Sequence, residues 1–228
     1  MKMNTIYSAL ALAATSLSLG VFSQAKEEKS LPAKIDDPGF VSIFNGKDLS
    51  GWKVNGENPG SIVAKDGMIV IDGKRTHAFY NGKVGNHDFK NFEFKAKVKT
   101  FANANSGIYF HTKFQDSGWP DAGYECQVNN THKDWRKTGS LYAVMDNKEE
   151  VAKDEEWFDY YIKVVGRHVV IKINGKVISD YTEPDNPEHL GKMPGRKIGS
   201  GTIALQAHDP ESVVHYKDLK LKILPDSK

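Results

Sequence analysis

NSGIYFHTKF (105–114), GYECQVNNTH (123–132) and GSLYAVMD (139–146) are the three stretches that indicate how this chain folds. Each places polar or aromatic side chains at every second residue, and the turns around them are marked by Gly107, Gly118, Gly123 and Gly139. Successive side chains of a strand point to opposite faces of a sheet. The alternation therefore predicts three strands that share one buried face and one polar face.

The sequence outside this region follows the same pattern. Two β-rich runs meet at Asp66–Gly67, which is a strong hairpin signal, and Asn174–Gly175 marks another hairpin. FEFKAKVK (92–99) alternates apolar and charged residues, as a strand with one wet face does. Helical periodicity is almost absent. We therefore predict an all-β fold, a jelly-roll β-sandwich of two antiparallel sheets.

The beginning of the chain indicates export. Residues 1–25 combine an early lysine, an apolar middle from Ile6 to Leu19 and small residues at the end, as a signal peptide does. A membrane anchor is the alternative, but serines and threonines interrupt this run, which is shorter than the ~20 residues that a span requires. We expect a charged tether at 26–38, one domain at 39–225, a periplasmic or secreted location, and no membrane insertion after cleavage.

Composition excludes several classes of function. The chain has 228 residues, with 31 Lys and Arg against 29 Asp and Glu, and the basic residues are scattered among acidic ones. A nucleic-acid-binding surface needs clustered basic residues, so we expect no nucleic-acid partner. The single cysteine, Cys126, excludes an internal disulfide framework, and its place in a strand pattern predicts a buried, unreactive thiol.

The alternation also predicts a polar floor. When a fourth strand, 202–209, is added to the first three, one face collects hydroxyl, amide, imidazole and carboxyl groups. The predicted floor consists of Tyr109, His111, Glu125, Gln127, Tyr142, Gln206 and His208, with Asn129 at the end of its strand. Amides and carboxylates bind hydroxyl groups, and aromatic rings stack on the apolar faces of sugars. We therefore expect a carbohydrate ligand.

Loops next to these strands supply the predicted walls. Trp119, His132, Trp135 and Arg136 lie on connections between the floor strands, although Arg136 is equally suited to pairing with a nearby carboxylate. Residues 182–201 form a long loop rich in proline and glycine. Loops of this length in compact domains are often functional, and disorder is the alternative.

Several motifs in this order resemble the 3-keto-disaccharide hydrolase domain family, whose fold is a concanavalin-A-like jelly roll. The motifs are FVSIFNGKDLSGWKV (40–54), NSGIYFHT (105–112), GYECQVNNTH (123–132), KTGSLYAV (137–144), INGKVISDY (173–181) and ALQAHD (204–209). The resemblance extends from about Gly39 to Leu224. This chain departs from the family at His111, where arginine is frequent, and at Cys126, where an aliphatic residue is frequent.

The resemblance implies cleavage of sugars that carry a ketone at C3. Such cleavage needs a base near C2, an electrophile for the enolate and an acid for the leaving oxygen. We expect Glu125 or His208 as the base, His111 and Gln127 at the keto oxygen, and Tyr142 as the acid. A divalent metal could act as the electrophile, with Glu125, His111 and His208 as candidate ligands. A sugar 3-oxidase is the implied partner that makes the substrate.

Two other functions remain open at this point. A non-catalytic carbohydrate-binding module would present the same polar and aromatic groups. It could leave Glu125 exposed and far from any histidine, whereas an enzyme should enclose Glu125 with His111 or His208. A glucanase would need two carboxylates about 5 to 9.5 Å apart, and the predicted floor supplies only Glu125.

Overall fold

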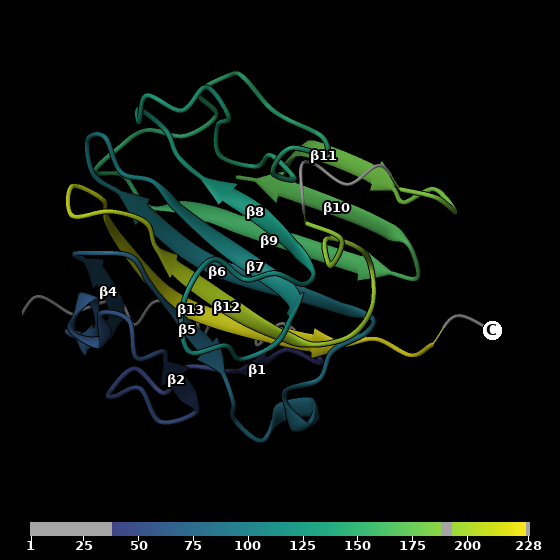
Figure 1. Ribbon diagram of the computed structural model, residues 1–228, viewed down its shortest axis with the longest axis horizontal. Helices are drawn as coiled ribbons and strands as arrows, with labels where there is room; N and C mark the ends of the chain where they lie inside the picture. The colour runs from purple at the N-terminus through teal and green to yellow at the C-terminus, as the bar shows by residue number, and fades with distance from the viewer. Residues whose placement is uncertain (1–37, 188–192, 227–228) are drawn as a thin grey trace, which may run out of the picture. The chain divides into compact units, whose positions relative to one another are not determined.

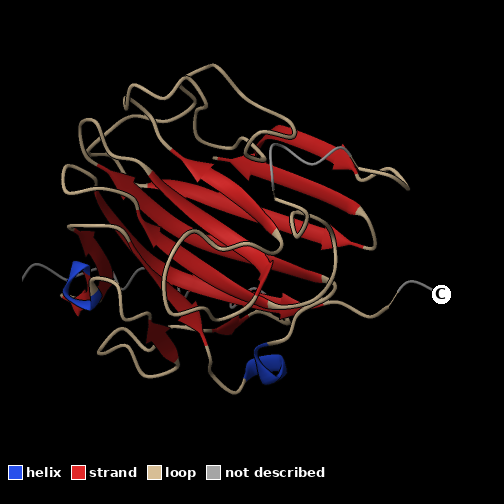
Figure 2. Cartoon of the chain, in the orientation of Figure 1, coloured by secondary structure: helices blue, strands red, loops and turns tan. Residues whose placement is uncertain are grey.

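The computed structural model describes residues 38–187 and 193–226, which form thirteen strands and two short 3₁₀ helices (Figures 1 and 2). The strands are β1 (Val41–Ser42), β2 (Trp52–Val54), β3 (Ile62–Lys65), β4 (Met68–Asp72), β5 (Thr76–Tyr80), β6 (Phe92–Thr100), β7 (Ser106–Thr112), β8 (Tyr124–Val128), β9 (Phe158–Val165), β10 (His168–Ile173), β11 (Lys176–Thr182), β12 (Thr202–Ala207) and β13 (Val213–Ile223). The helices are η1 (Pro59–Ser61) and η2 (Val84–His87). The predicted signal peptide at 1–25 and the predicted tether up to residue 37 lie outside the described residues.

Two sheets face each other across the core, and the strands within each sheet pair in antiparallel fashion. The larger sheet has the order β11-β10-β9-β6-β13-β4-β3, with β1 paired to β13. The smaller sheet has the order β2-β5-β12-β7-β8, and its strands overlie those of the larger sheet in Figure 1. The predicted all-β sandwich of two antiparallel sheets is confirmed.

The turn residues and the alternation set the register of the larger sheet. Asp66 and Gly67 have φ values of 51° and 78°, and they join β3 to β4 as the hairpin signal predicted. Strand β6 alternates between buried and half-buried residues along its whole length. Because its charged side chains point to solvent, only one face of this sheet contributes to the core.

The core lies between the sheets and is rich in aromatic side chains. Phe92, Phe94, Tyr160 and Tyr216 from the larger sheet are each no more than 1% exposed. Cys126 on β8 is fully buried among them, and burial raises the pKa of its thiol well above the usual range. The predicted buried, unreactive cysteine is therefore confirmed in its placement.

The strand predicted at 139–146 is wrong in its second half. Residues 139–142 do pair with β8: the Gly139 amide donates to the Gln127 carbonyl oxygen, and the Tyr142 amide donates to the Glu125 carbonyl oxygen. The chain then turns back at Ala143, where φ is 62°, so that Met145 bonds to Leu141. A positive φ at a non-glycine residue carries no signature in an alternating pattern. Tyr142 therefore stands at a turn beside the sheet.

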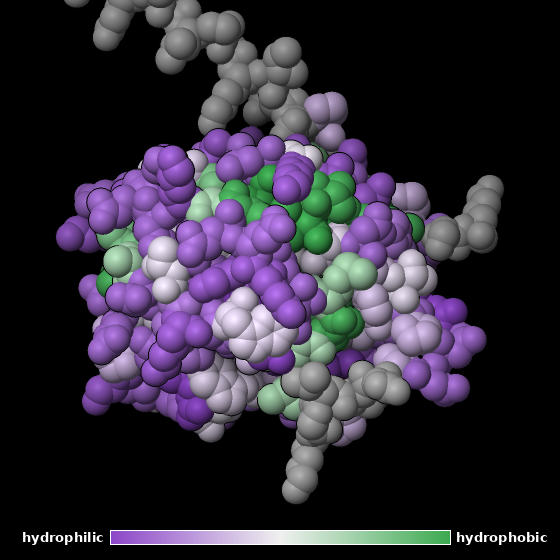
Figure 3. Space-filling view, turned by 90° about the horizontal axis from the view of Figure 1, so that it is seen from above, coloured by the Kyte–Doolittle hydropathy of each residue, from purple (hydrophilic) through white to green (hydrophobic). Residues whose placement is uncertain are grey.

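The surface is mostly hydrophilic on the face shown in Figure 3, with a compact hydrophobic patch on it. No helix in the described part of the chain is long and apolar enough to cross a membrane.

Candidate active site

The outer face of the smaller sheet carries four of the predicted floor residues. Tyr109 on β7 pairs with Glu125 on β8, and Gln127 and Gln206 lie on β8 and β12. Their exposed fractions run from 1% to 5%. An outer sheet face is normally wet, so this degree of burial requires loops to cover it. The alternation therefore predicted the direction of these side chains correctly, and the loops determine their environment.

Glu125 is enclosed by hydrogen-bond donors. Its Oε1 accepts from Gln206 Nε2 at 3.1 Å, and its Oε2 accepts from Arg196 Nη2 at 3.3 Å. The Gln206 amide also donates to the Tyr109 hydroxyl at 2.8 Å. Gly107 on β7 pairs with Gln127 on β8. A Cβ atom at Gly107 would stand 2.6 Å from Glu125 Oε1. Glycine at this position therefore leaves space for the carboxylate.

Arg196 lies between β11 and β12, in the segment predicted as a long loop. Its side chain is 5% exposed, and it passes over the rings of Tyr142 and Tyr109, with its Cζ 5.5 and 5.9 Å from their centroids. Burial alone would lower the pKa of Arg196, but the Glu125 carboxylate beside it raises that pKa. Gly195 permits the approach of the loop, because a Cβ atom there would stand 2.1 Å from the Asp121 carbonyl oxygen. The result is a buried ion pair on the floor.

Tyr142 lines the cavity, and two guanidinium groups lie near its ring. Arg136 lies 4.7 Å and Arg196 5.5 Å from the centroid of its ring. Arg136 is fixed in turn by Asp146, whose Oδ2 lies 3.1 Å from its Nε. Burial is the main cause of a raised pKa at Tyr142. Its phenol therefore stays protonated at neutral pH and can donate a proton.

His208 lies at the end of β12, beside Trp119. The centroids of the two rings are 5.1 Å apart, and the angle between the ring planes is 35°. His208 Nδ1 lies 2.7 Å from Asp209 Oδ2, and His132 Nε2 lies 4.0 Å from the same oxygen. Burial raises the pKa of Asp209, but hydrogen bonds from His208 and the Glu211 amide bring it below its usual value. An ionised Asp209 can only accept a proton from Nδ1, so Nε2 is the acceptor nitrogen in the neutral form of the ring.

These groups share one cavity of about 210 Å³. Its lining residues are Asn105, Tyr109, Trp119, Glu125, Gln127, Asp134, Tyr142, Met193, Arg196, Gln206 and His208. Sequence reasoning missed Asn105, Asp134, Met193 and Arg196. The only available signal for Arg196 was the length of its loop, because a loop has no periodicity from which a side-chain direction can be read.

His111 does not face the floor, so the placement expected for it is wrong. Its φ is 56°, and the pairing of β7 with β12 shifts register at this point. The extra residue of a β-bulge reverses the side-chain direction. The ring packs edge-on against Phe92 instead, its Nε2 donates to the Lys90 carbonyl oxygen at 2.9 Å, and its Nδ1 accepts from the Gly199 amide at 3.2 Å.

Three other predicted contact residues do not line the cavity. Asn129 is buried, and its Nδ2 donates to the carbonyl oxygens of Asp134 and Arg136. Trp135 is 47% exposed and stacks on the Arg136 guanidinium at 4.5 Å. None of Asn129, Trp135 and Arg136 is among the lining residues. In the structure they hold the loop that carries Asp134 and support Tyr142.

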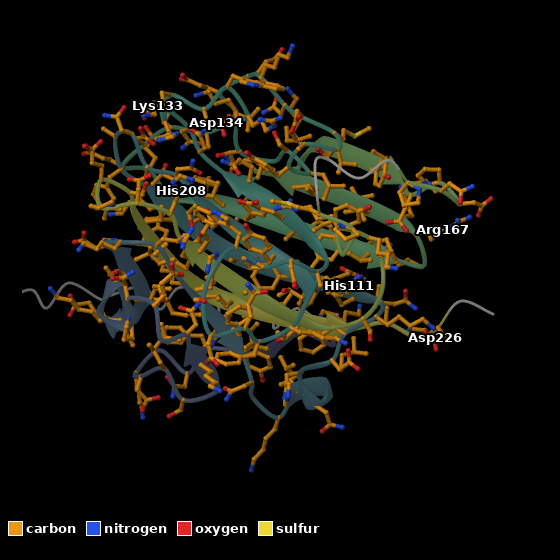
Figure 4. The ribbon with its side chains drawn as sticks, viewed as in Figure 1. His111, Lys133, Asp134, Arg167, His208 and Asp226 are labelled. Carbon is orange, nitrogen blue, oxygen red and sulfur yellow. The ribbon has the colours of Figure 1, made fainter. Side chains whose placement is uncertain are left out.

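The three candidate metal ligands do not converge. Figure 4 shows His208 near Asp134 at one end of the sheet and His111 toward the other end. Glu125 is already paired with Arg196. Among the described residues, no group of three or more His, Cys, Asp and Glu side chains could hold a metal ion. Metal dependence stays a prediction.

Known proteins resemble this chain both in sequence and in fold. A curated 3-keto-disaccharide hydrolase from Bacteroides thetaiotaomicron is 28% identical over 184 residues, which cover 69% of this chain and 63% of that protein. The chain thus spans less than two thirds of that relative's length. A provisionally named glycosyl hydrolase from Parabacteroides distasonis is 26% identical with a TM-score of 0.69, over 82% of this chain and 94% of that one.

A more distant structure, a Bacillus subtilis protein of unknown function with a galectin-like fold, has a TM-score of 0.53 at 11% identity. It covers 78% of this chain and 92% of its own, and it supports the predicted lectin-like sandwich. The sequence model of the 3-keto-alpha-glucoside-1,2-lyase-like domain matches residues 39–222. Since this match includes nearly the whole sandwich and all the cavity residues, the chain belongs to the 3-keto-alpha-glucoside-1,2-lyase-like domain family.

Proposed function

We propose that this protein is an exported enzyme that cleaves the glycosidic bond of 3-keto-disaccharides and related 3-keto-glycosides. Family membership and the name of the Bacteroides relative support this substrate class. The observation that carries the proposal is the buried Glu125–Arg196 ion pair, which lies on the floor of a cavity that also contains Tyr142 and His208. These groups are the ones that an elimination next to a ketone requires.

The ketone determines the chemistry. A carbonyl group at C3 acidifies the proton on C2, so a base can remove it and leave an enolate whose negative charge lies on the C3 oxygen. The enolate then reforms the ketone, a double bond forms between C1 and C2, and the bond from C1 to the leaving oxygen breaks. That oxygen takes a proton from an acid. Water then adds its hydroxyl group to C1 and a proton returns to C2, so the net reaction is hydrolysis.

The cavity residues can be assigned to these steps. Glu125 takes the C2 proton, because its carboxylate lies on the floor of the cavity. Arg196 and the amide of Gln127 stabilise the charge on the C3 oxygen, in the place first expected for His111. Tyr142, which burial keeps protonated, donates to the leaving oxygen. His208, whose Nδ1 is bonded to Asp209, offers Nε2 to accept a proton from the attacking water.

The enclosure of Glu125 supports an enzyme over a binding module. Glu125 is 5% exposed and shares its cavity with His208, which is the arrangement expected of an enzyme. A glucanase that acts by two carboxylates is also testable, because Asp134 lines the same cavity. The substrates separate the two enzymes, because only the elimination depends on a ketone at C3.

Location, metal and substrate supply complete the proposal. We infer from the expected signal peptide that the protein works in the periplasm or outside the cell. A sugar 3-oxidase must then supply the 3-keto substrate. A divalent metal is tested by measuring the activity with and without a chelator.

The decisive experiment incubates the purified protein with a 3-keto-disaccharide and with its unoxidised parent. Release of monosaccharide from the keto sugar alone is the expected result. Release from the parent alone would favour the glucanase, and release from neither would leave the binding module. A Glu125→Gln variant should lose at least about a hundredfold in kcat, and full activity in this variant would exclude Glu125 as the base.

A further inference from the structure

Trp119 is held from outside the cavity by an ion pair. The Arg75 guanidinium lies over the Trp119 ring, with its Cζ 4.9 Å from the centroid. Glu57 Oε1 accepts from Arg75 Nε at 2.9 Å and also from Arg75 Nη2. Neither Glu57 nor Arg75 lines the cavity. The pair therefore contacts the wall of the site from behind.

The same carboxylate also fixes the main chain next to Trp119. Glu57 Oε2 accepts from the Gly118 amide at 3.1 Å. Hydrogen bonds from Arg75, followed by that of Gly118, lower the pKa of Glu57. Glu57 is therefore ionised at neutral pH and connects the β2–β3 segment to the β7–β8 loop.

Gln115 ties the loop to itself. Its Nε2 donates to the carbonyl oxygens of Trp119 at 2.8 Å and Ser117 at 2.9 Å, and its Oε1 accepts from the Asp121 amide at 3.1 Å. These bonds keep the loop folded but attach it to no other element. Glu57 and Arg75 add contacts that join Gly118 and Trp119 to another segment of the chain.

The position of Trp119 matters because its ring contacts two parts of the site. It packs edge-on against the buried His77, with the ring centroids 5.7 Å apart, and its centroid lies 5.1 Å from that of the His208 ring. An indole ring in a sugar pocket binds the apolar C–H face of a pyranose. A shift of this ring would weaken that contact while leaving Glu125 and Arg196 in place.

We propose that Glu57 and Arg75 are positioning residues that hold Trp119 as the pyranose-binding wall of the cavity. This inference rests on the proposed function, since it assumes that a 3-keto pyranose ring occupies the cavity. Loss of the pair should raise KM and leave kcat nearly unchanged, because neither residue touches the reacting atoms.

The test compares Arg75→Ala, Glu57→Gln and Arg75→Lys in the full chain on a 3-keto-disaccharide. Arg75→Ala and Glu57→Gln should raise KM about three- to tenfold with kcat within about twofold. Arg75→Lys keeps the charge over the ring and should recover part of the loss. Arg167→Ala is the matched control, because it breaks the exposed Arg167–Asp185 pair far from the cavity and should change neither constant.

A second measurement removes any dependence on turnover. Glu125→Gln, alone and combined with Arg75→Ala, is titrated with the 3-hydroxy form of the disaccharide, and tryptophan fluorescence reports binding. Weaker binding in the double variant supports the inference even if the wild-type protein proves inactive, which would overturn only the proposed function. An unchanged KM and an unchanged dissociation constant in folded Arg75→Ala protein would overturn the inference.

Discussion

At the scale of single residues, the Glu125–Arg196 pair is difficult to explain by stability. Removing two charges from water costs several kcal/mol per ion, and well-packed apolar residues would often serve a core as well. Both side chains are nearly inaccessible, with exposed fractions of 6% and 5%. A buried, hydrogen-bonded carboxylate in a cavity is instead typical of a functional site.

Arg196→Lys tests this pair most directly. Lysine keeps the positive charge that Glu125 needs but loses the planar fork that can bond a carboxylate and an enolate oxygen together. We expect kcat to fall about a hundredfold, while the thermal midpoint falls by only a few degrees. Steady-state kinetics on a 3-keto-disaccharide measures the first quantity and calorimetry the second.

Lys197→Ala, at the exposed next position, is the control and should match the wild-type protein. A lysine variant with wild-type kcat would show that the charge alone suffices and that the guanidinium geometry has no role in the reaction.

Asp209→Asn is expected to reduce kcat at least about tenfold. The carboxylate can only accept the Nδ1 proton of His208, whereas an asparagine amide can donate to Nδ1 and reverse the tautomer, so that Nε2 can no longer accept a proton from water. Kinetics at saturating substrate measures the loss. Glu211→Gln removes a nearby exposed charge and should have no effect on kcat. An equal loss in both variants would show that the negative charge of the loop, and not the contact between Asp209 and His208, supports the reaction.

The alternating pattern predicted the floor residues but could not predict their partners. Glu125, Gln127, Gln206 and Tyr109 were predictable, because period-two alternation in β7, β8 and β12 fixes which face each side chain takes. His111 was wrongly placed because a one-residue bulge reverses every direction after it. Arg196 was missed because side-chain directions in a loop depend on tertiary contacts.

At the scale of elements, the backbone of the bulge in β7 packs closely against the neighbouring main chain. Gly123 and Gly201 lie against its backbone: a Cβ atom at Gly123 would stand 1.9 Å from the Phe110 carbonyl oxygen, and one at Gly201 would stand 2.3 Å from that of Thr112. The main chain on both sides therefore closes around His111. This arrangement directs the following loop, which carries Trp119, over the floor.

Gly123→Ala should consequently destabilise the protein far more than Gly118→Ala. Both glycines have a positive φ, 74° and 80°, and any side chain there costs about 1 to 2 kcal/mol. At Gly118 the new Cβ atom would have its nearest neighbour at 3.7 Å, whereas at Gly123 it would overlap the backbone. We expect an additional loss of at least about 2 kcal/mol, or failure to fold, for Gly123→Ala. Urea unfolding measures the difference, and equal midpoints would contradict the role given to the bulge.

At the scale of the whole molecule, the two sheets differ in the exposure of their outer faces to solvent. The outer face of the larger sheet is wet, so the alternation of β6 and β9 is visible in the sequence as polar against apolar residues. All residues of β5, β7, β8 and β12 are buried. Loops cover the outer face of the smaller sheet and enclose titratable groups there, among them His77 and Glu125.

His77 is one of these enclosed groups, and it should make the stability of the molecule depend on pH. It is fully buried beneath Trp119, and among the described residues neither of its ring nitrogens has a hydrogen-bond partner. Burial lowers its pKa from 6.5 to about 4, while the charge of Glu57 opposes this shift and those of Arg75 and His208 reinforce it. The unfolded chain therefore binds a proton at a higher pH than the folded chain does.

The sign of the effect follows from this difference. Between pH 6.5 and about 4 the unfolded state carries more protons at this position, so stability falls as the pH falls. At pH 5 the loss relative to pH 7.5 should be about 2 kcal/mol from His77 alone. Urea unfolding of the wild-type protein and of His77→Leu at the two pH values measures it, since the leucine variant lacks the titrating group and should lose about 2 kcal/mol less. His87→Gln, at an exposed position, should keep the wild-type dependence. An identical pH dependence in the leucine variant would show that the acid sensitivity of the fold arises elsewhere.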